Sequence, residues 1–184
     1  MDDYEQKKRE LIEEITSAFD GVSREDGVTL HEAMALDDYA DDEERAQARA
    51  QDTEARWQDV PDEDIGWSDM ALYFLDAKGF RYYIPAFLVW FLKHTDRVDS
   101  PFRDSGIFSS VLWHLDAKHK GFTPEQSRAI ARFLAFQAER EKKSNAEDEE
   151  RLRAEVARGE ASQEEADDRL SRYAITDAQD ALDC

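Results

Sequence analysis

The clearest candidate for binding chemistry in this sequence is an arginine set among aromatic residues. Arg81 is followed directly by Tyr82 and Tyr83, and Trp90 comes nine positions after it. A guanidinium binds a carboxylate or a phosphate through two parallel hydrogen bonds, and aromatic rings can wall such a pocket. These four residues are therefore a candidate pocket for an anionic ligand or a partner. The alternative is structural, in which Arg81 pairs with an acid such as Asp76 and stacks on a ring.

A second candidate is a short run of acidic residues that could dock a basic protein. Asp37, Asp38, Asp41 and Asp42 lie within six positions of one another. Like charges four residues apart on a helix repel, at a cost of a few tenths of a kcal/mol per pair. Either this face is solvated, or a cationic partner relieves the repulsion. Both interpretations stay open at this point.

The sequence gives little support for a metal site, a phosphate-binding loop or a catalytic site. His114 and His119 are five residues apart, so they do not share one helical face as two metal ligands would. A calcium loop that began at Asp62 would need glycine at its sixth position and a carboxylate at its twelfth, where this chain has Trp67 and Tyr73. The sequence contains no glycine-rich phosphate loop, no paired cysteines and no nucleophile elbow. We therefore expect no metal, no cofactor and no catalytic residue.

The net charge of the chain argues against some classes of binding partner. The formal net charge is −20, and residues 1–64 carry most of it, whereas residues 65–136 are close to neutral and hold most of the aromatic residues. Binding to nucleic acid or to an anionic membrane needs clustered lysine and arginine, so neither partner is expected.

The longest apolar run, Tyr82–Leu92, is too short for the ~20 residues that span a bilayer. With no signal peptide and Cys184 as the only cysteine, the expected location is cytoplasmic.

The spacing of apolar residues predicts the helices that would position these candidates. A helix over residues 4–19 is followed by a second one that begins with a capping box at Thr29 and carries Met34 and Tyr39 on its apolar face. Residues 41–56 have almost no large apolar side chain, so they form either a solvated helix or a loose arm.

The segment around the candidate pocket is expected to change conformation at Pro85. A helix over 68–79 should end at a glycine, and residues 81–84 should form at most a short extended piece, because proline disfavours helical geometry before it. The next helix, 85–93, is apolar nearly all round, so it should form the buried centre of the fold.

The remaining sequence predicts three further helical segments. One covers residues 108–118, and another begins at the capping sequence Thr123–Gln126 and extends past residue 140. Residues 146–174, with a capping box at Ser162, resemble a charged helical hairpin.

Together these elements predict a mainly α fold, a compact multi-helix domain with acidic peripheral helices. The domain should cover residues 1–140, with an acidic arm at 37–64 that is either helical or flexible. Residues 141–184 should form the charged hairpin and a C-terminal tail.

The segment Phe74–Phe87 also resembles the diagnostic region of a family of uncharacterised bacterial proteins, a domain of unknown function. The resemblance is carried by Gly-Phe-Arg-Tyr-Tyr-Ile-Pro-Ala at 79–86 and by Phe-Leu-Ala-Phe at 133–136, and it covers roughly residues 10–138. Because that family has no assigned activity, the resemblance implies one compact domain and no mechanism.

Two functions from different classes follow from these observations. The first is a non-enzymatic, acidic protein-interaction module, such as an immunity-like protein that binds a basic partner. The second is a small-ligand-binding or enzymatic domain with an anion pocket around Arg81. The sequence leaves the oligomeric state open.

Overall fold

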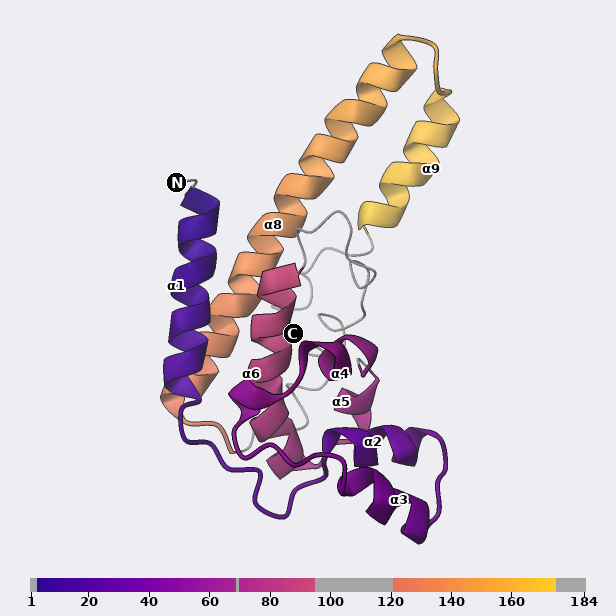
Figure 1. Cartoon of the computed structure of the whole chain (residues 1–184). Helices are drawn as coiled ribbons and strands as arrows, with labels where there is room; N and C mark the ends of the chain where they lie inside the picture. The colour runs from indigo at the N-terminus through magenta and orange to yellow at the C-terminus, as the bar shows by residue number, and fades with distance from the viewer. Residues whose placement is uncertain (1–2, 69, 95–120, 175–184) are drawn as a thin grey trace. The chain divides into compact units, whose positions relative to one another are not determined.

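The computed structural model describes residues 3–68, 70–94 and 121–174. Regular structure in these ranges is helical throughout, which confirms the predicted mainly α fold (Figure 1). The elements are α1 (Asp3–Ala18), α2 (Leu30–Asp37), α3 (Asp42–Arg49), the 3-10 helix η1 (Trp57–Asp59), α4 (Asp62–Trp67), α5 (Ala71–Phe74), α6 (Ala77–His94), α8 (Pro124–Ala157) and α9 (Gln163–Ala174). The helix expected over 108–118 lies outside the described residues. The chain divides into two compact units, Met1–Ile130 and Ala131–Cys184.

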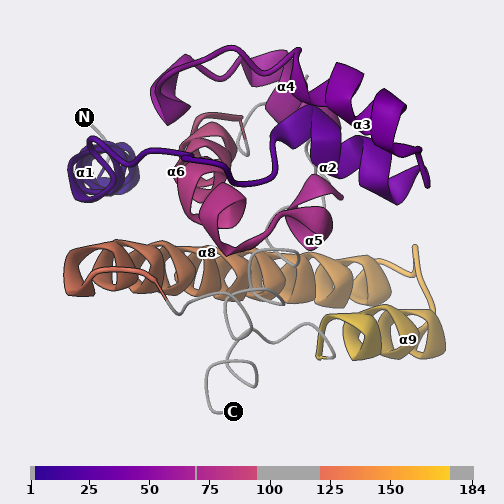
Figure 2. The same cartoon turned by 90° about the horizontal axis from the view of Figure 1, so that it is seen from below.

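Helix α6 forms the centre of the first unit. It lies between α1 on one side and α2 on the other (Figure 2), and α1, η1 and α4 all contact it. Its residues from Phe80 to Leu92 are buried, with Arg81 the exception. Phe87 and Trp90 are thus in the core, as the apolar character of 85–93 predicts.

The predicted break in the helix at 81–84 is wrong, because α6 begins at Ala77 and runs through Pro85 without interruption. The carboxylate of Asp76 caps the helix by accepting the N–H of Gly79 at 2.8 Å. The N–H of Phe80 closes the first turn on the carbonyl of Asp76, also at 2.8 Å. The expected helix over 68–79 is therefore divided, with only the short α5 before this cap.

A proline inside a helix lacks the N–H that would bond the carbonyl four residues earlier, here that of Arg81, at a cost of roughly 3 kcal/mol. Complete burial of a large apolar side chain contributes about 1.5–3 kcal/mol. Because α6 buries Phe80, Tyr82 and Tyr83 before the proline, continuing the helix through Pro85 is favourable on balance.

The loop after α1 lies directly against the first turn of α6. A Cβ added to Gly79 would be 2.3 Å from the carbonyl oxygen of Val28, and one added to Gly27 would be 2.6 Å from the backbone nitrogen of Gly79. The same contact is held by the Asp76 carboxylate, which also accepts the N–H of Val28 at 3.0 Å. Two glycines therefore permit backbone-to-backbone packing here.

The predicted helix starts at Thr29, Thr123 and Ser162 are confirmed as reciprocal capping boxes. A fourth box, which the sequence analysis missed, lies in the acidic arm. Asp41 accepts the N–H groups of Glu43 and Glu44 at 2.9 and 3.0 Å, and the Glu44 carboxylate accepts the N–H of Asp41. Of the two alternatives left open for this arm, residues 42–49 therefore form the solvated helix.

The second unit contains α8 from residue 131 onward and α9. The helix that starts at Pro124 continues without a break to Ala157, so the hairpin consists of its last turns and α9. Leu152 of α8 and Ala166 of α9 are buried, and Arg169 of α9 pairs with Glu155 of α8 at 3.5 Å. Within the described ranges, no helix combines the length and the apolar character that crossing a bilayer requires.

Candidate functional site

The four residues of the predicted pocket all lie on α6, but the helix does not bring them together. Successive residues turn by 100°, so Arg81 and Trp90, nine positions apart, point to opposite sides of the helix. Tyr82 and Tyr83 are only 1% and 0% exposed, and their rings form an edge-to-face pair with centroids 4.9 Å apart. The tyrosines therefore face the interior rather than an anion site shared with Arg81.

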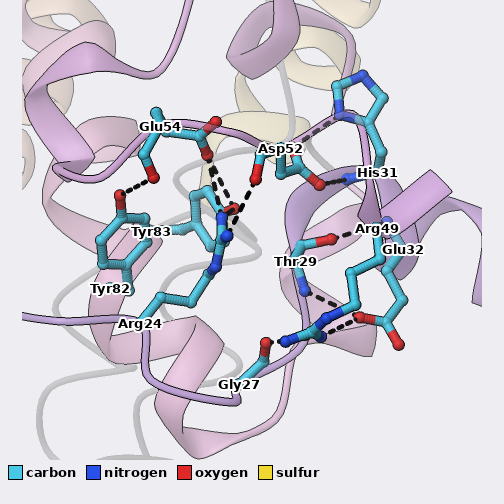
Figure 3. Close-up of polar contacts among 10 residues, drawn as sticks. All are labelled: Arg24, Gly27, Thr29, His31, Glu32, Arg49, Asp52, Glu54, Tyr82 and Tyr83. Atoms are coloured by element: carbon cyan, nitrogen blue, oxygen red, sulfur yellow. Dashed lines mark hydrogen bonds and ion pairs between the residues drawn. The ribbon is translucent and has the colours of Figure 1, made fainter. Parts of the chain in front are cut away.

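The cation that the tyrosines contact is Arg24, from the loop between α1 and α2 (Figure 3). Its Nη1 donates to the hydroxyl oxygen of Tyr83 at 2.7 Å and lies 3.3 Å from a carboxylate oxygen of Glu54. Its Nη2 donates to the backbone carbonyl of Asp52 at 3.0 Å. The guanidinium also lies over the ring of Tyr82, 5.5 Å from the centroid. One side chain thus joins three segments that are distant in sequence.

Glu54 completes this inner cluster by accepting hydrogen bonds from both tyrosines. The hydroxyl of Tyr83 donates to the Glu54 carboxylate at 3.1 Å, and the hydroxyl of Tyr82 donates to the Glu54 backbone carbonyl at 3.2 Å. Burial, and then the nearby Glu54 carboxylate, raises the pKa of Tyr82 to about 12. Burial also raises the pKa of Tyr83, followed by the charges of Asp52 and Glu54. Both hydroxyl groups therefore remain protonated donors.

A second group of contacts continues from Asp52 to the start of α2. The carboxylate of Asp52 accepts the backbone N–H of His31 at 3.0 Å, and its other oxygen lies 2.8 Å from Nδ1 of the same histidine. Nearby, Arg49 bonds the carboxylate of Glu32 at 2.6 Å and the carbonyl of Gly27 at 3.0 Å (Figure 3). Asp52 is buried, so these bonds offset the cost of removing its charge from water.

This network holds the loop, the start of α2, residues 49–54 and the first half of α6 in one arrangement. Its donors and acceptors bond one another, so none of these contacts presents a group poised for a substrate. No local pattern in the sequence marks Arg24 or Glu54 as partners of Tyr83, because they lie 59 and 29 positions away from it.

Arg81 itself is half-buried on another side of α6. Its Nε is fully buried and has no hydrogen-bond partner within the described residues. The proposed pairing with Asp76 is not formed, because that carboxylate accepts backbone N–H groups instead.

Trp90 lies at a different feature, a cleft of roughly 140 Å³ in the first unit. Residues from α1, η1, α4 and α6 line it, and Trp57 contributes a second indole.

The predicted acidic face lies at the turn between α2 and α3. Asp38 is the C-cap of α2, Asp41 is the N-cap of α3, and the Asp42 side chain is 97% exposed while lying 3.5 Å from Arg45. Between the two caps, Tyr39 is 96% exposed, so its assignment to the apolar face of the helix is wrong. The capping pair Asp41–Glu44 is the sequence signal that could have identified residues 38–40 as a turn.

The backbone of this turn makes the tyrosine unusual. Ala40 N–H bonds the carbonyl of Ala35 at 2.9 Å and Tyr39 N–H bonds that of Leu36 at 3.2 Å, which is a Schellman motif with Tyr39 at its left-handed position. The φ of Tyr39 is +58°. In the second unit the same motif ends α8, and there Gly159 takes the left-handed position.

Within the described residues, no three histidine, cysteine, aspartate or glutamate side chains gather in a group that could hold a metal ion.

Comparison with known proteins identifies a family but no activity. The model of a family described as "Family of unknown function (DUF6714)" matches residues 7–157, which confirms the resemblance to a family without an assigned function. No curated protein and no solved structure matches the chain.

Proposed function

The chain belongs to DUF6714, a family of unknown function, and we propose that its first unit is an acidic protein-interaction module that docks a basic protein at the α2–α3 turn. The docking surface consists of Tyr39 with Asp37, Asp38, Asp41 and Asp42. The partner presents lysine or arginine side chains to it.

The observation that carries this proposal is the exposed tyrosine at the left-handed position. A side chain with a Cβ costs roughly 1–2 kcal/mol in this conformation, which is why glycine is usual there. Tyr39 is almost fully exposed, so burial within the chain does not offset that cost. Tyrosine is among the residues that contribute most to protein interfaces, because its ring is large and rigid.

The charges around Tyr39 indicate the chemistry of the partner. Residues 1–64 carry 22 acidic and 7 basic side chains, and two aspartates of the turn precede Tyr39 in the sequence while two follow it. An arginine can stack on the ring while its guanidinium bonds a carboxylate. Such a surface attracts a basic protein over a distance of about one Debye length, ~8–10 Å at physiological salt.

The alternative, a ligand-binding or enzymatic domain with an anion pocket around Arg81, has less support. Tyr82 and Tyr83 bond Arg24 and Glu54, and Trp90 is on the opposite side of α6 from Arg81. An anion at Arg81 would have to be held without these three residues.

The test replaces Tyr39 by glycine. Because glycine accepts the positive φ, Tyr39→Gly should raise the free energy of unfolding by about 1 kcal/mol. The same variant should lose the proteins that the wild type captures from a native lysate. A matched control is Glu25→Gly, since Glu25 is also exposed and has a φ of +55°. The control should retain every captured protein.

Charge is tested by replacing the four aspartates with asparagine. Asparagine caps a helix as well as aspartate does, so α3 should remain intact. Association with the captured protein should slow, and its dependence on salt should weaken. If Tyr39→Gly and the asparagine variant recover the same proteins as the wild type, the acidic turn is only solvated and the proposal is wrong.

A further inference from the structure

We propose that the cleft lined by Trp57 and Trp90 binds a free amino acid with a compact apolar side chain. This proposal is independent of the docking surface, because it uses residues of α1, η1, α4 and α6 rather than those of the α2–α3 turn.

The size of the cleft limits the apolar part of the ligand. Its volume is roughly 140 Å³. An apolar cavity of about 150 Å³ accommodates one benzene molecule. A single six-membered ring or a branched aliphatic chain would therefore fill the cleft.

The two tryptophans are held in place without a ligand. The indole N–H of Trp57 donates to the carbonyl of Phe19 at 2.9 Å, inside the core. The ring of Trp90 stacks on His94 with centroids 4.7 Å apart and planes 25° apart, and Nδ1 of His94 donates to the Trp90 carbonyl at 2.8 Å. Rigid walls reduce the entropy that binding would otherwise cost.

The remaining apolar walls come from aliphatic residues of three elements. Ile12 on α1, Ile65 on α4 and Val89 on α6 contribute to the lining. Thr16 adds no free donor, because its hydroxyl already donates to the carbonyl of Ile12 at 2.7 Å. The interior of the cleft therefore suits a hydrocarbon group.

Two groups of opposite charge also line the cleft, beside the polar side chain of Gln58, and they specify the polar part of the ligand. Lys93 is exposed, and its amine makes no ion pair in the part of the chain that the structure describes. Asp62 has a side chain that is 60% exposed and lies 3.6 Å from Nε2 of His94. A carboxylate pairs with the lysine and an ammonium with the aspartate, so the complementary head group is a zwitterion. An α-amino acid has this head group next to its side chain.

The experiment is isothermal titration calorimetry on the full chain with four probes. L-Phenylalanine and L-leucine have the complete head group, 3-phenylpropionate lacks the ammonium, and phenethylamine lacks the carboxylate. We expect one or both amino acids to bind. Each of the two incomplete probes should bind at least about tenfold more weakly, because each loses a charge-assisted contact.

Three variants locate the binding site. Ala86→Leu should abolish binding by filling the cleft, while the control Ala46→Leu on the exposed face of α3 should leave it unchanged. Lys93→Gln should weaken amino-acid binding to the level of phenethylamine, and Asp62→Asn to that of 3-phenylpropionate. Both charged side chains are exposed, so Lys93→Gln and Asp62→Asn should fold normally. If Ala86→Leu does not fold, these two variants test whether the ligand binds in the cleft.

Three results would overturn the proposal. The first is no heat of binding for either amino acid up to millimolar concentration. The second is equal binding of the amino acids and both incomplete probes, which would show that the head group is not recognised. The third is unchanged binding in Lys93→Gln and Asp62→Asn, which would place the ligand elsewhere.

Discussion

Arg24 and Tyr83 are 59 positions apart, and Nη1 of the arginine donates to the tyrosine hydroxyl at 2.7 Å. The same guanidinium also reaches Glu54 and the backbone of Asp52. Through one residue, the loop after α1 and the segment before η1 are both fixed to α6. The stability of the first unit should therefore depend strongly on this arginine.

Replacing Arg24 by methionine should lower the free energy of unfolding by about 2–4 kcal/mol, because it leaves the half-buried carboxylate of Glu54 without its cation. Urea denaturation measures this change. Arg56→Met is the matched control, since Arg56 forms an exposed ion pair with Asp59 at 2.6 Å that should contribute at most about 1 kcal/mol. Equal effects of the two substitutions would mean that the network contributes little.

The buried tyrosines should make the protein less stable at alkaline pH. The pKa of Tyr82 is about 12 and that of Tyr83 is also raised, compared with about 10 in an unfolded chain. As pH rises, the unfolded chain therefore loses these protons first. The contribution to stability is complete below pH ~10 and declines as pH rises through ~12.

Urea denaturation between pH 8 and pH 11.5 tests this expectation. The double variant Tyr82→Phe, Tyr83→Phe should be less stable at pH 8, and its stability should decline less above pH 10 than that of the wild type. An identical slope in both proteins would show that other groups cause the alkaline loss.

Adding a methyl group at Gly79 should destabilise the fold, although alanine favours helices by about 1 kcal/mol over glycine. The new Cβ would be 2.3 Å from the carbonyl oxygen of Val28, which cannot move without shifting the loop. We expect Gly79→Ala to reduce stability by about 1–3 kcal/mol, as for an overpacked core. A melting temperature equal to or above that of the wild type would mean that the loop yields without cost.

Substitutions at Asp41 test whether the N-cap of α3 stabilises the acidic arm. Asp41→Ala removes the acceptor for the N–H groups of Glu43 and Glu44 and should cost about 1 kcal/mol. Asp41→Asn should have almost no effect on stability. Denaturation of the two variants distinguishes a capping role from simple repulsion, since repulsion alone would make both substitutions stabilising.

Local signals in the sequence predicted much of the fold. The capping boxes at Thr29, Thr123 and Ser162 involve residues only three positions apart, so their geometry follows from the sequence itself. The burial of Phe87 and Trp90 follows from an apolar run that has no polar face. These features need no knowledge of the tertiary structure.

The path of α6 and the composition of the sites could not be predicted in the same way. The preference of Pro85 for an extended predecessor is a local effect, and the burial of three aromatic residues before it outweighs that preference. Arg81 was chosen as the key cation because it adjoins the tyrosines in sequence. The tertiary fold instead supplies Arg24, and the helical repeat separates Arg81 from Trp90.

The contacts of the Arg24 network also have a consequence for how fast the first unit folds. The pairs His31–Asp52, Val28–Asp76 and Arg24–Tyr83 close chain loops of 21, 48 and 59 residues. Helical proteins dominated by local contacts fold within microseconds to milliseconds, and folding slows as contacts become more distant in sequence. We therefore expect this unit to refold more slowly than helical bundles of its size. Its rate-limiting step should be the closure of these loops rather than the formation of any one helix.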